Sequence, residues 1–256
     1  MMILISPAKK LDFSGVRPDL AHTVPALMPE VERLAKLARK LKAADLKRLM
    51  GISDALATLN HERFQSFHTP FTLDNAKHAA LAFNGDTYQG LDAKTLSDAD
   101  LAYAQDHLRI LSGLYGLLRP LDLMQPYRLE MGIKLANPRG EDLYDFWGER
   151  VTALLNDQIK ADPDPVVINL ASTEYSSVVQ TKKLQARLIT PVFKEVKDDV
   201  AKVIGLMAKR ARGAMARHII VNRIEDPMLL KKFSAGGYKF HPEHSTDSRF
   251  EFYRQA

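Results

Sequence analysis

The chain has 256 residues, 46% of them hydrophobic and 26% charged, which is an ordinary globular composition long enough for one large domain or two small ones. The absence of cysteine excludes disulfides, thiolate catalysis, iron–sulfur clusters and cysteine-type zinc sites. No apolar run approaches the ~20 residues that cross a bilayer, and no basic region precedes the short apolar run at 1–5, so we expect a cytoplasmic protein without a membrane partner.

Helix and strand patterns are mixed along the chain, judged from apolar periodicity and from capping residues such as Ser53 and Ser97. In chain order they predict a strand at 1–5, helices at 31–41 and 53–67, a strand at 79–83, helices at 97–110 and 143–159, strands at 166–170 and 188–193, a helix at 196–211, a short helix from 226 and a strand at 249–254. Because the two kinds of element do not alternate strictly, we expect one mixed α/β (α+β) domain over 1–256 rather than a doubly wound fold.

Gly113 and Gly116 form the most distinctive motif, since they lie three residues apart among apolar residues at the end of the helix predicted over 97–110. This order is typical of a helix-hairpin-helix, whose glycine turn brings backbone N–H groups to a DNA phosphate, so we predict that motif at about 97–130. The predicted DNA-contacting residues in it are Gly113, Leu114, Tyr115, Gly116 and Arg119. The alternative is that the glycines simply end a helix before Pro120.

The charge is unevenly distributed, although the net value is only +5. From Lys182 onward there are 16 Lys and Arg against 8 Asp and Glu, a balance of +8, whereas the rest of the chain is at −3. A basic C-terminal third suits a polyanionic partner such as double-stranded DNA read without strong sequence preference, and it equally suits a solvated surface.

Polar residues follow two of the predicted buried strands, where strand ends often form a site. The candidate pocket residues are Ser6, Asn169, Ser172, Glu174 and Tyr175. Lys9 and Lys10 would be paired cations at the mouth of a cleft, binding a phosphate of DNA or of a small anionic metabolite. If the protein is an enzyme that acts on a small anionic metabolite, Glu174 or Tyr175 would act as the general acid or base. The alternative is that Ser172 or Thr173 only caps a helix.

Two other groups of residues, one aromatic and one of possible metal ligands, are given no functional role. The aromatic cluster at 144–147 is expected in the core. His241, Glu243 and His244 are metal-type side chains, but their spacing matches no metal motif, and no phosphate-binding or dinucleotide-binding glycine sequence occurs. We therefore predict no cofactor and no metal site, and direct iron binding through His241, Glu243 and His244 is the weaker alternative.

Several motifs, taken together and in order, resemble one bacterial family. They are found at 5–10, 83–91, 111–120, 125–132, 144–147, 169–175 and 233–238. In this arrangement the chain is similar to the YaaA peroxide-stress proteins over almost its whole length. The resemblance implies a cytosolic protein that acts during hydrogen peroxide stress and keeps unincorporated iron low, which limits Fenton damage. It also implies a single compact fold of unusual topology, with a basic cleft and an embedded helix-hairpin-helix that binds DNA.

Overall fold

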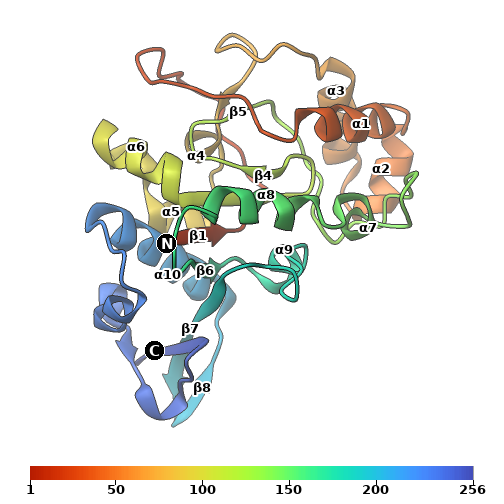
Figure 1. The fold of residues 1–256 in the computed structure, drawn as a ribbon. Helices are drawn as coiled ribbons and strands as arrows, with labels where there is room; N and C mark the ends of the chain where they lie inside the picture. Colours follow the sequence, from red (N-terminus) through yellow and green to blue (C-terminus); the bar gives the residue numbers. More distant parts are fainter. Residues whose placement is uncertain (256) are drawn as a thin grey trace.

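A mixed eight-stranded sheet forms the centre of the protein (Figure 1); the structure is a computed structural model and describes residues 1–255. Its order is β4-β3-β1-β6-β7-β10-β9, and β8 pairs with β7. The strands are β1 (Met2–Ile5), β3 (Leu108–Ser112), β4 (Gly116–Leu118), β6 (Val166–Leu170), β7 (Arg187–Lys197), β8 (Val200–Lys202), β9 (Lys239–Phe240) and β10 (Arg249–Gln255). A separate two-stranded sheet joins β2 (Lys77–His78) to β5 (Leu123–Met124).

The central strands are parallel and covered on both faces. Strands β3, β1, β6, β7 and β10 run in the same direction, whereas β4, β8 and β9 pair antiparallel at the margins. Every residue of β1 and β6 is buried, which fits their nearly continuous apolar sequences, Asn169 in β6 being the one polar residue. In β7 the burial alternates along the strand, so one of its faces is more exposed than the other.

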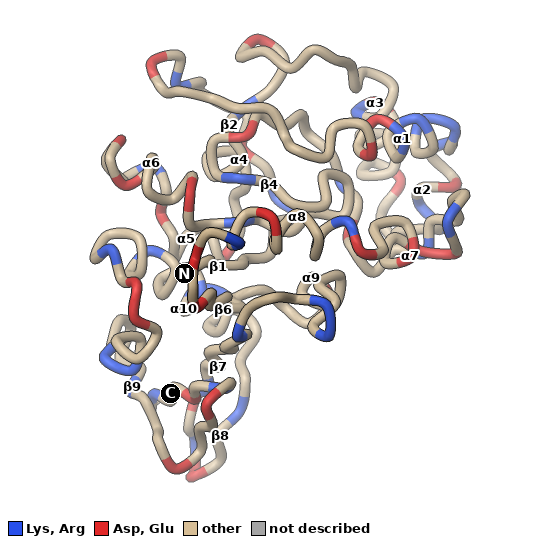
Figure 2. Tube along the Cα trace, in the orientation of Figure 1, with Lys and Arg blue, Asp and Glu red and all other residues tan. Residues whose placement is uncertain are grey.

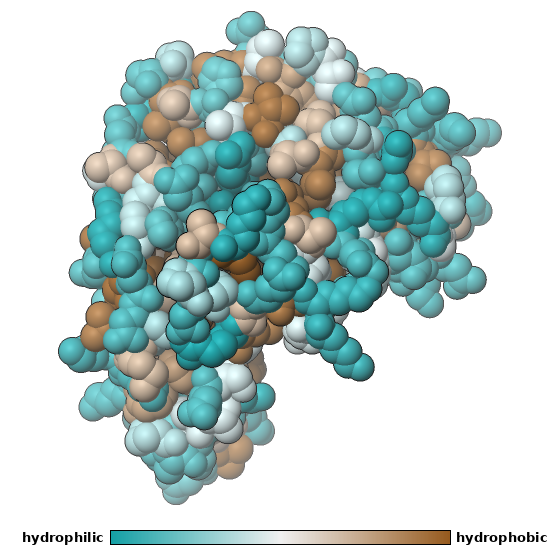
Figure 3. Space-filling view, viewed as in Figure 1, coloured by the Kyte–Doolittle hydropathy of each residue, from teal (hydrophilic) through white to brown (hydrophobic). Residues whose placement is uncertain are grey.

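Helices cover the two faces of the sheet and form a cluster at one end. They are α1 (Met28–Arg39), α2 (Ala43–Met50), α3 (Asp54–Ser66), α4 (Ala79–Ala82), α5 (Asp86–Leu91), α6 (Asp98–His107), α7 (Leu143–Trp147), α8 (Arg150–Ile159), α9 (Thr173–Ser176) and α10 (Gly205–Val221). Helix α10 packs on α5 and on β1, β6 and β7, and Figure 1 shows α8 in front of the strands on the other side. Figure 3 shows hydrophilic side chains over most of the visible face, with smaller apolar areas between them.

Most predicted elements are present, and the exceptions have local causes. The strand predicted at 79–83 is the short helix α4, and the helix predicted at 97–110 ends at His107, where β3 begins. The helix predicted at 143–159 is divided at Gly148, which has φ +50°. The helix predicted at 196–211 begins only at Gly205, because Asp198 and Asp199 adopt positive φ and turn β7 back into β8.

The helix-hairpin-helix predicted at 97–130 is wrong. The segment around Gly113 and Gly116 is the buried turn of the β3–β4 hairpin, in which Ser112 pairs with Gly116. A Cβ at Gly113 would lie 2.2 Å from the carbonyl oxygen of Leu129, and one at Gly116 (φ +69°) would lie 2.7 Å from the ring of Trp147. Glycine is required at both positions because other parts of the chain pack directly against them. The backbone N–H groups of this turn are therefore not accessible to a phosphate.

The other DNA-contacting residues predicted with that turn also have structural roles. Leu114 and Tyr115 are completely buried. Arg119 forms an ion pair of 3.1 Å with the buried carboxylate of Asp122, whose Oδ2 also accepts a hydrogen bond from the Arg119 backbone N–H. These residues hold the hairpin in place and do not line an open groove.

A glycine turn between two helices does occur, but at another place in the chain. Helices α2 and α3 are joined by Gly51, Ile52 and Ser53. Gly51 has φ +60°, and a Cβ there would meet no atom within 4 Å, so the turn faces solvent. Ser53 caps α3 by accepting a hydrogen bond from the backbone N–H of Leu56.

Candidate functional site

The site begins where the order of the parallel strands reverses. The chain passes from β1 to β3 on one side of β1, and later places β6 on its other side, followed by β7. In open α/β sheets such a switch point leaves a crevice outside the carboxyl ends of the strands, and ligands bind there. Ser6 follows β1 and Ser172 lies two residues after β6, so both belong to this crevice.

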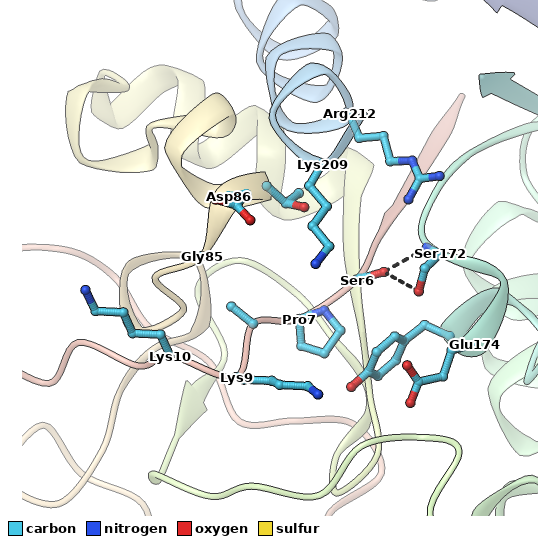
Figure 4. A pocket seen from close by; sticks show the side chains of 13 residues that line it. Ser6, Pro7, Lys9, Lys10, Gly85, Asp86, Ser172, Glu174, Lys209 and Arg212 are labelled. Atoms are coloured by element: carbon cyan, nitrogen blue, oxygen red, sulfur yellow. Dashed lines mark hydrogen bonds between the residues drawn. The ribbon is translucent and has the colours of Figure 1, made fainter. Parts of the chain in front are cut away.

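A cavity of about 260 Å³ lies at this point (Figure 4). It is lined by Ser6, Pro7, Ala8, Lys9, Lys10, Gly85, Asp86, Thr87, Ser172, Glu174, Tyr175, Lys209 and Arg212. These residues come from the loop after β1, the start of α5, the β6–α9 turn with α9 itself, and one face of α10. We call it the strand-end pocket.

Two serines join the strand ends at the base of the pocket. Ser6 Oγ accepts a hydrogen bond of 2.8 Å from the Ser172 backbone N–H and donates one of 3.3 Å to Ser172 Oγ. The hydroxyl of Tyr88 donates to the Ser6 carbonyl oxygen at 3.1 Å. Ser172 stands at the start of α9, yet its side chain makes no capping hydrogen bond. Ser172 is thus the N-cap residue by position, as the capping alternative expects, while its hydroxyl bonds to Ser6 and not to the helix backbone.

Four cations surround the pocket, and three of them lack a carboxylate partner. Lys9 lies 3.2 Å from Glu130. Among residues 1–255, no carboxylate oxygen lies within 4 Å of the charged nitrogens of Lys10, Lys209 or Arg212. Figure 4 shows Lys209 reaching from α10 toward Pro7, with Arg212 on the side of Ser172. The pocket thus carries an excess of positive charge that an anion would neutralise.

Arg212 is the most unusual of these cations. Its guanidinium is half-buried, and within the described part of the chain it has no hydrogen-bond partner. Burial away from water lowers the pKa of Arg212 from its ordinary value. A desolvated charge without a partner is costly to the folded state, and such groups concentrate at binding sites.

The acidic side of the pocket is formed by Glu174 and its neighbours. Glu174 Oε1 accepts a hydrogen bond from the Gly132 backbone N–H at 3.2 Å, and its carbonyl oxygen accepts one from the Tyr144 hydroxyl at 2.6 Å. Tyr175 is buried, and burial raises the pKa of its hydroxyl well above the ordinary value. Tyr175 therefore stays protonated near neutral pH, and its hydroxyl can donate or accept a hydrogen bond.

Close packing of α5 against α10 fixes the cationic wall. A Cβ at Gly213 would lie 1.8 Å from the Thr87 carbonyl oxygen, and one at Gly90 would lie 2.1 Å from the Arg210 carbonyl oxygen. Only glycine permits this approach. Lys209 and Arg212, three residues apart on α10, are consequently held at a set distance from the start of α5.

Most residues predicted for a strand-end site do meet there. Ser6, Lys9, Lys10, Ser172, Glu174 and Tyr175 all line the same cavity. Asn169 does not: its Oδ1 accepts a hydrogen bond from the Ala171 backbone N–H, and its side chain lines a neighbouring cavity instead. Its role is to shape the turn after β6.

Sequence reasoning missed the contribution of α5 and α10. Asp86 and Thr87 line the pocket, and so do Lys209 and Arg212, although from the sequence the last two count only toward the basic C-terminal third. Their i, i+3 spacing was the available signal, because it puts both cations on one side of the helix.

The other candidate metal residues remain a surface group. His241 Nδ1 lies 2.7 Å from Glu243, and His244 lies 3.9 Å from the same carboxylate. No set of three or more His, Asp or Glu side chains within residues 1–255 is arranged to hold a metal ion. In the same range, no helix has the length and apolar character that spanning a bilayer requires.

Comparison with known proteins gives a consistent result over the full length. A sequence model described as "Peroxide stress protein YaaA" matches residues 1–244. A UPF0246 protein of Alteromonas mediterranea is 54% identical over 254 residues, covering 99% of this chain and 98% of that protein. A UPF0246 protein of Ralstonia nicotianae is 55% identical over 256 residues, covering all of both chains.

Proposed function

The chain belongs to the YaaA family of peroxide stress proteins, and we propose that it serves this role by binding a small, phosphate-bearing metabolite in the strand-end pocket. The observation that carries the proposal is the convergence of Ser6, Ser172, Lys209 and Arg212 on one cavity at the sheet's switch point. A guanidinium, an ammonium and two hydroxyls are the groups that proteins use to bind a phosphate.

The size of the cavity favours a small ligand over a nucleic-acid backbone. At about 260 Å³ it suits a compact molecule, whereas a DNA duplex needs a long open surface. The phosphate would lie between Arg212 and the serine pair, and the rest of the ligand would extend toward Glu174. Glu174 is the group placed to exchange a proton with the ligand, with the Tyr175 hydroxyl as a hydrogen-bond donor.

The proposal is tested by calorimetric titration of inorganic phosphate and of ribose 5-phosphate into the protein and two variants. Arg212→Gln removes the unpaired guanidinium and should weaken both ligands by about tenfold or more. Arg210→Gln is the matched control, since Arg210 lies on the same helix but contacts Gln89 outside the pocket. Equal affinity in the two variants, or no binding to the unaltered protein, would reject the pocket as a phosphate site.

We infer that the same pocket connects the protein to the low intracellular iron that the family resemblance implies. In that case, cells that carry only Arg212→Gln should accumulate chelatable iron under peroxide, and cells with Arg210→Gln should not. Electron paramagnetic resonance of chelated ferric iron in whole cells measures this. If both variants keep iron low, the pocket has no part in the iron phenotype.

DNA binding is a second candidate function, supported by the α2–α3 turn. The turn at Gly51 faces solvent, and Lys47 and Arg48 lie in the last turn of α2 beside it. The start of α3 offers backbone N–H groups of the kind that bind phosphates in helix-hairpin-helix proteins. Asp54 opposes this role, because its carboxylate stands at the same helix start, 2.8 Å from Lys47.

A salt series with a labelled DNA duplex tests the second candidate. Binding should weaken with a slope near −0.9 per neutralised phosphate on logarithmic axes. Lys47→Glu with Arg48→Glu should abolish it, whereas Lys9→Ala with Lys10→Ala should leave it intact. Loss only in the second variant would transfer DNA binding to the strand-end pocket, and retention in both would exclude the α2–α3 turn.

A further inference from the structure

A second cavity, remote in sequence from the strand-end pocket, lies against helix α1. It has a volume of about 350 Å³ and is lined by Arg33, Lys36, Leu37, Lys40, Pro138, Arg139 and Phe146. The lining comes from α1, the turn before α7 and α7 itself, none of which contributes to the strand-end pocket. Figure 2 shows Lys and Arg residues repeated along α1. We call it the α1 cleft.

Every charged side chain that lines the α1 cleft is a cation. Glu30 lies nearby, but three guanidiniums share it: Arg139 at 2.7 Å, Arg33 at 3.0 Å and Arg150 at 3.7 Å. One carboxylate therefore faces three positive charges. The excess at this edge of the protein attracts anions.

Lys36 and Lys40 increase the excess further. They stand one turn apart on the exposed side of α1, where two like charges repel. Within residues 1–255, neither ammonium has a carboxylate oxygen within 4 Å. Both are thus available to a ligand without breaking an existing ion pair.

The floor of the cleft is apolar, and one wall is fixed. Half-buried Leu37 and exposed Pro138 supply the accessible apolar surface, and Phe146, which also lines the cleft, is almost wholly buried. The Arg139 guanidinium stacks on the Phe146 ring, 4.6 Å from its centre, and donates a hydrogen bond to the Phe146 carbonyl oxygen at 3.0 Å. Held by the ring, by that carbonyl and by Glu30, Arg139 presents its charge at the edge of an apolar surface without having to reorganise.

We propose that the α1 cleft binds a small carboxylate with an apolar body, such as a medium-chain or aromatic acid. Its carboxylate would lie among Lys36, Lys40 and Arg139, and its apolar body would cover Leu37 and Pro138. Inorganic phosphate or a nucleic-acid backbone would satisfy the cations but would leave the apolar floor uncovered. The site is independent of the phosphate site proposed above.

The test uses decanoate as the probe and calorimetry of the full-length protein as the readout. Decanoate should bind with 1:1 stoichiometry, and decanol, which has the same apolar body without the charge, should bind at least about tenfold more weakly. Lys36→Glu with Lys40→Glu should weaken decanoate by about tenfold or more and leave decanol unchanged. Leu37→Gln should weaken both probes.

A charge-matched control separates this site from the strand-end pocket. Lys10→Glu with Lys209→Glu changes the net charge by the same amount but lies in the other cavity. That variant should bind decanoate normally and no longer bind inorganic phosphate. Lys36→Glu with Lys40→Glu should bind inorganic phosphate normally and bind decanoate more weakly. Decanoate binding that is absent, insensitive to the Lys36 and Lys40 changes, or lost in the Lys10 and Lys209 variant would overturn the proposal.

Discussion

Replacing Gly113 with alanine distinguishes a buried hairpin turn from a DNA-binding turn. The new Cβ would lie 2.2 Å from the Leu129 carbonyl oxygen and 3.0 Å from the Leu129 carbonyl carbon, well inside van der Waals contact. These are backbone atoms of a buried segment, so the clash cannot be relieved by rotating a flexible side chain. The turn or the segment at Leu129 must move by about 1 Å.

The expected cost is at the upper end of the range for overpacking, about 3 kcal/mol in the free energy of unfolding. For a domain of this size that corresponds to a fall in Tm of about 6–12 °C. Thermal unfolding followed by circular dichroism measures it. Gly205→Ala is the control, because a Cβ at Gly205, the first residue of α10, meets nothing within 4 Å and alanine favours the helix.

A Gly113→Ala protein within about 0.5 kcal/mol of the parent would contradict this reasoning, since it would mean that the turn can yield. If Gly113→Ala lowered the affinity for DNA without changing stability, the turn would have to be exposed and in contact with DNA, contrary to the structure. A large loss of stability together with unchanged Gly205→Ala supports the buried β-hairpin.

Three further predictions concern pH, helix packing and the serine pair. Burial lowers the pKa of His78, so this histidine is neutral in the folded protein and takes up a proton on unfolding below about pH 6.5. The free energy of unfolding should therefore be constant above about pH 6.5 and fall by at most about 1.4 kcal/mol per pH unit below it. Urea unfolding at several pH values measures this, and the fall should be less steep in His78→Gln. A pH-independent midpoint would count against it. Gly213→Ala would meet the Thr87 carbonyl oxygen at 1.8 Å, and calorimetry should show weaker phosphate binding as well as lower stability; normal affinity would mean that α10 can move freely. Ser6→Ala leaves the Ser172 N–H without its acceptor and should lower the free energy of unfolding by about 1–2 kcal/mol. Chemical denaturation measures this, and an unchanged curve would contradict the prediction.

The parts of the fold that could be predicted are those set by local pattern. The continuous apolar runs before Ser6 and at 166–170 identified two buried strands, and parallel pairing then brought the polar residues after them together. Lys209 lies within the helix predicted at 196–211 and Arg212 directly follows it, but which neighbour that helix faces depends on glycine contacts between α5 and α10, which are far apart in the chain.

The hairpin at Gly113 was misread for a related reason. Two glycines among apolar residues satisfy both a helix-hairpin-helix turn and a β-hairpin turn. What decides between them is burial against Leu129 and Trp147, residues that the local motif does not include. The exposed glycine turn at Gly51 lacks the apolar glycine pattern of 111–117, so the local sequence does not single it out.

The strand-end pocket is tested most directly by locating a bound phosphate mimic in a crystal. Tungstate scatters anomalously and has the charge and tetrahedral shape of a phosphate group, so its position can be found without assuming a site. We predict an anomalous peak within hydrogen-bond distance of Arg212 and the serine pair, absent from crystals of Arg212→Gln and present in those of Arg210→Gln. An empty pocket, with tungstate bound only at the α2–α3 turn or elsewhere on the surface, would contradict the proposed function.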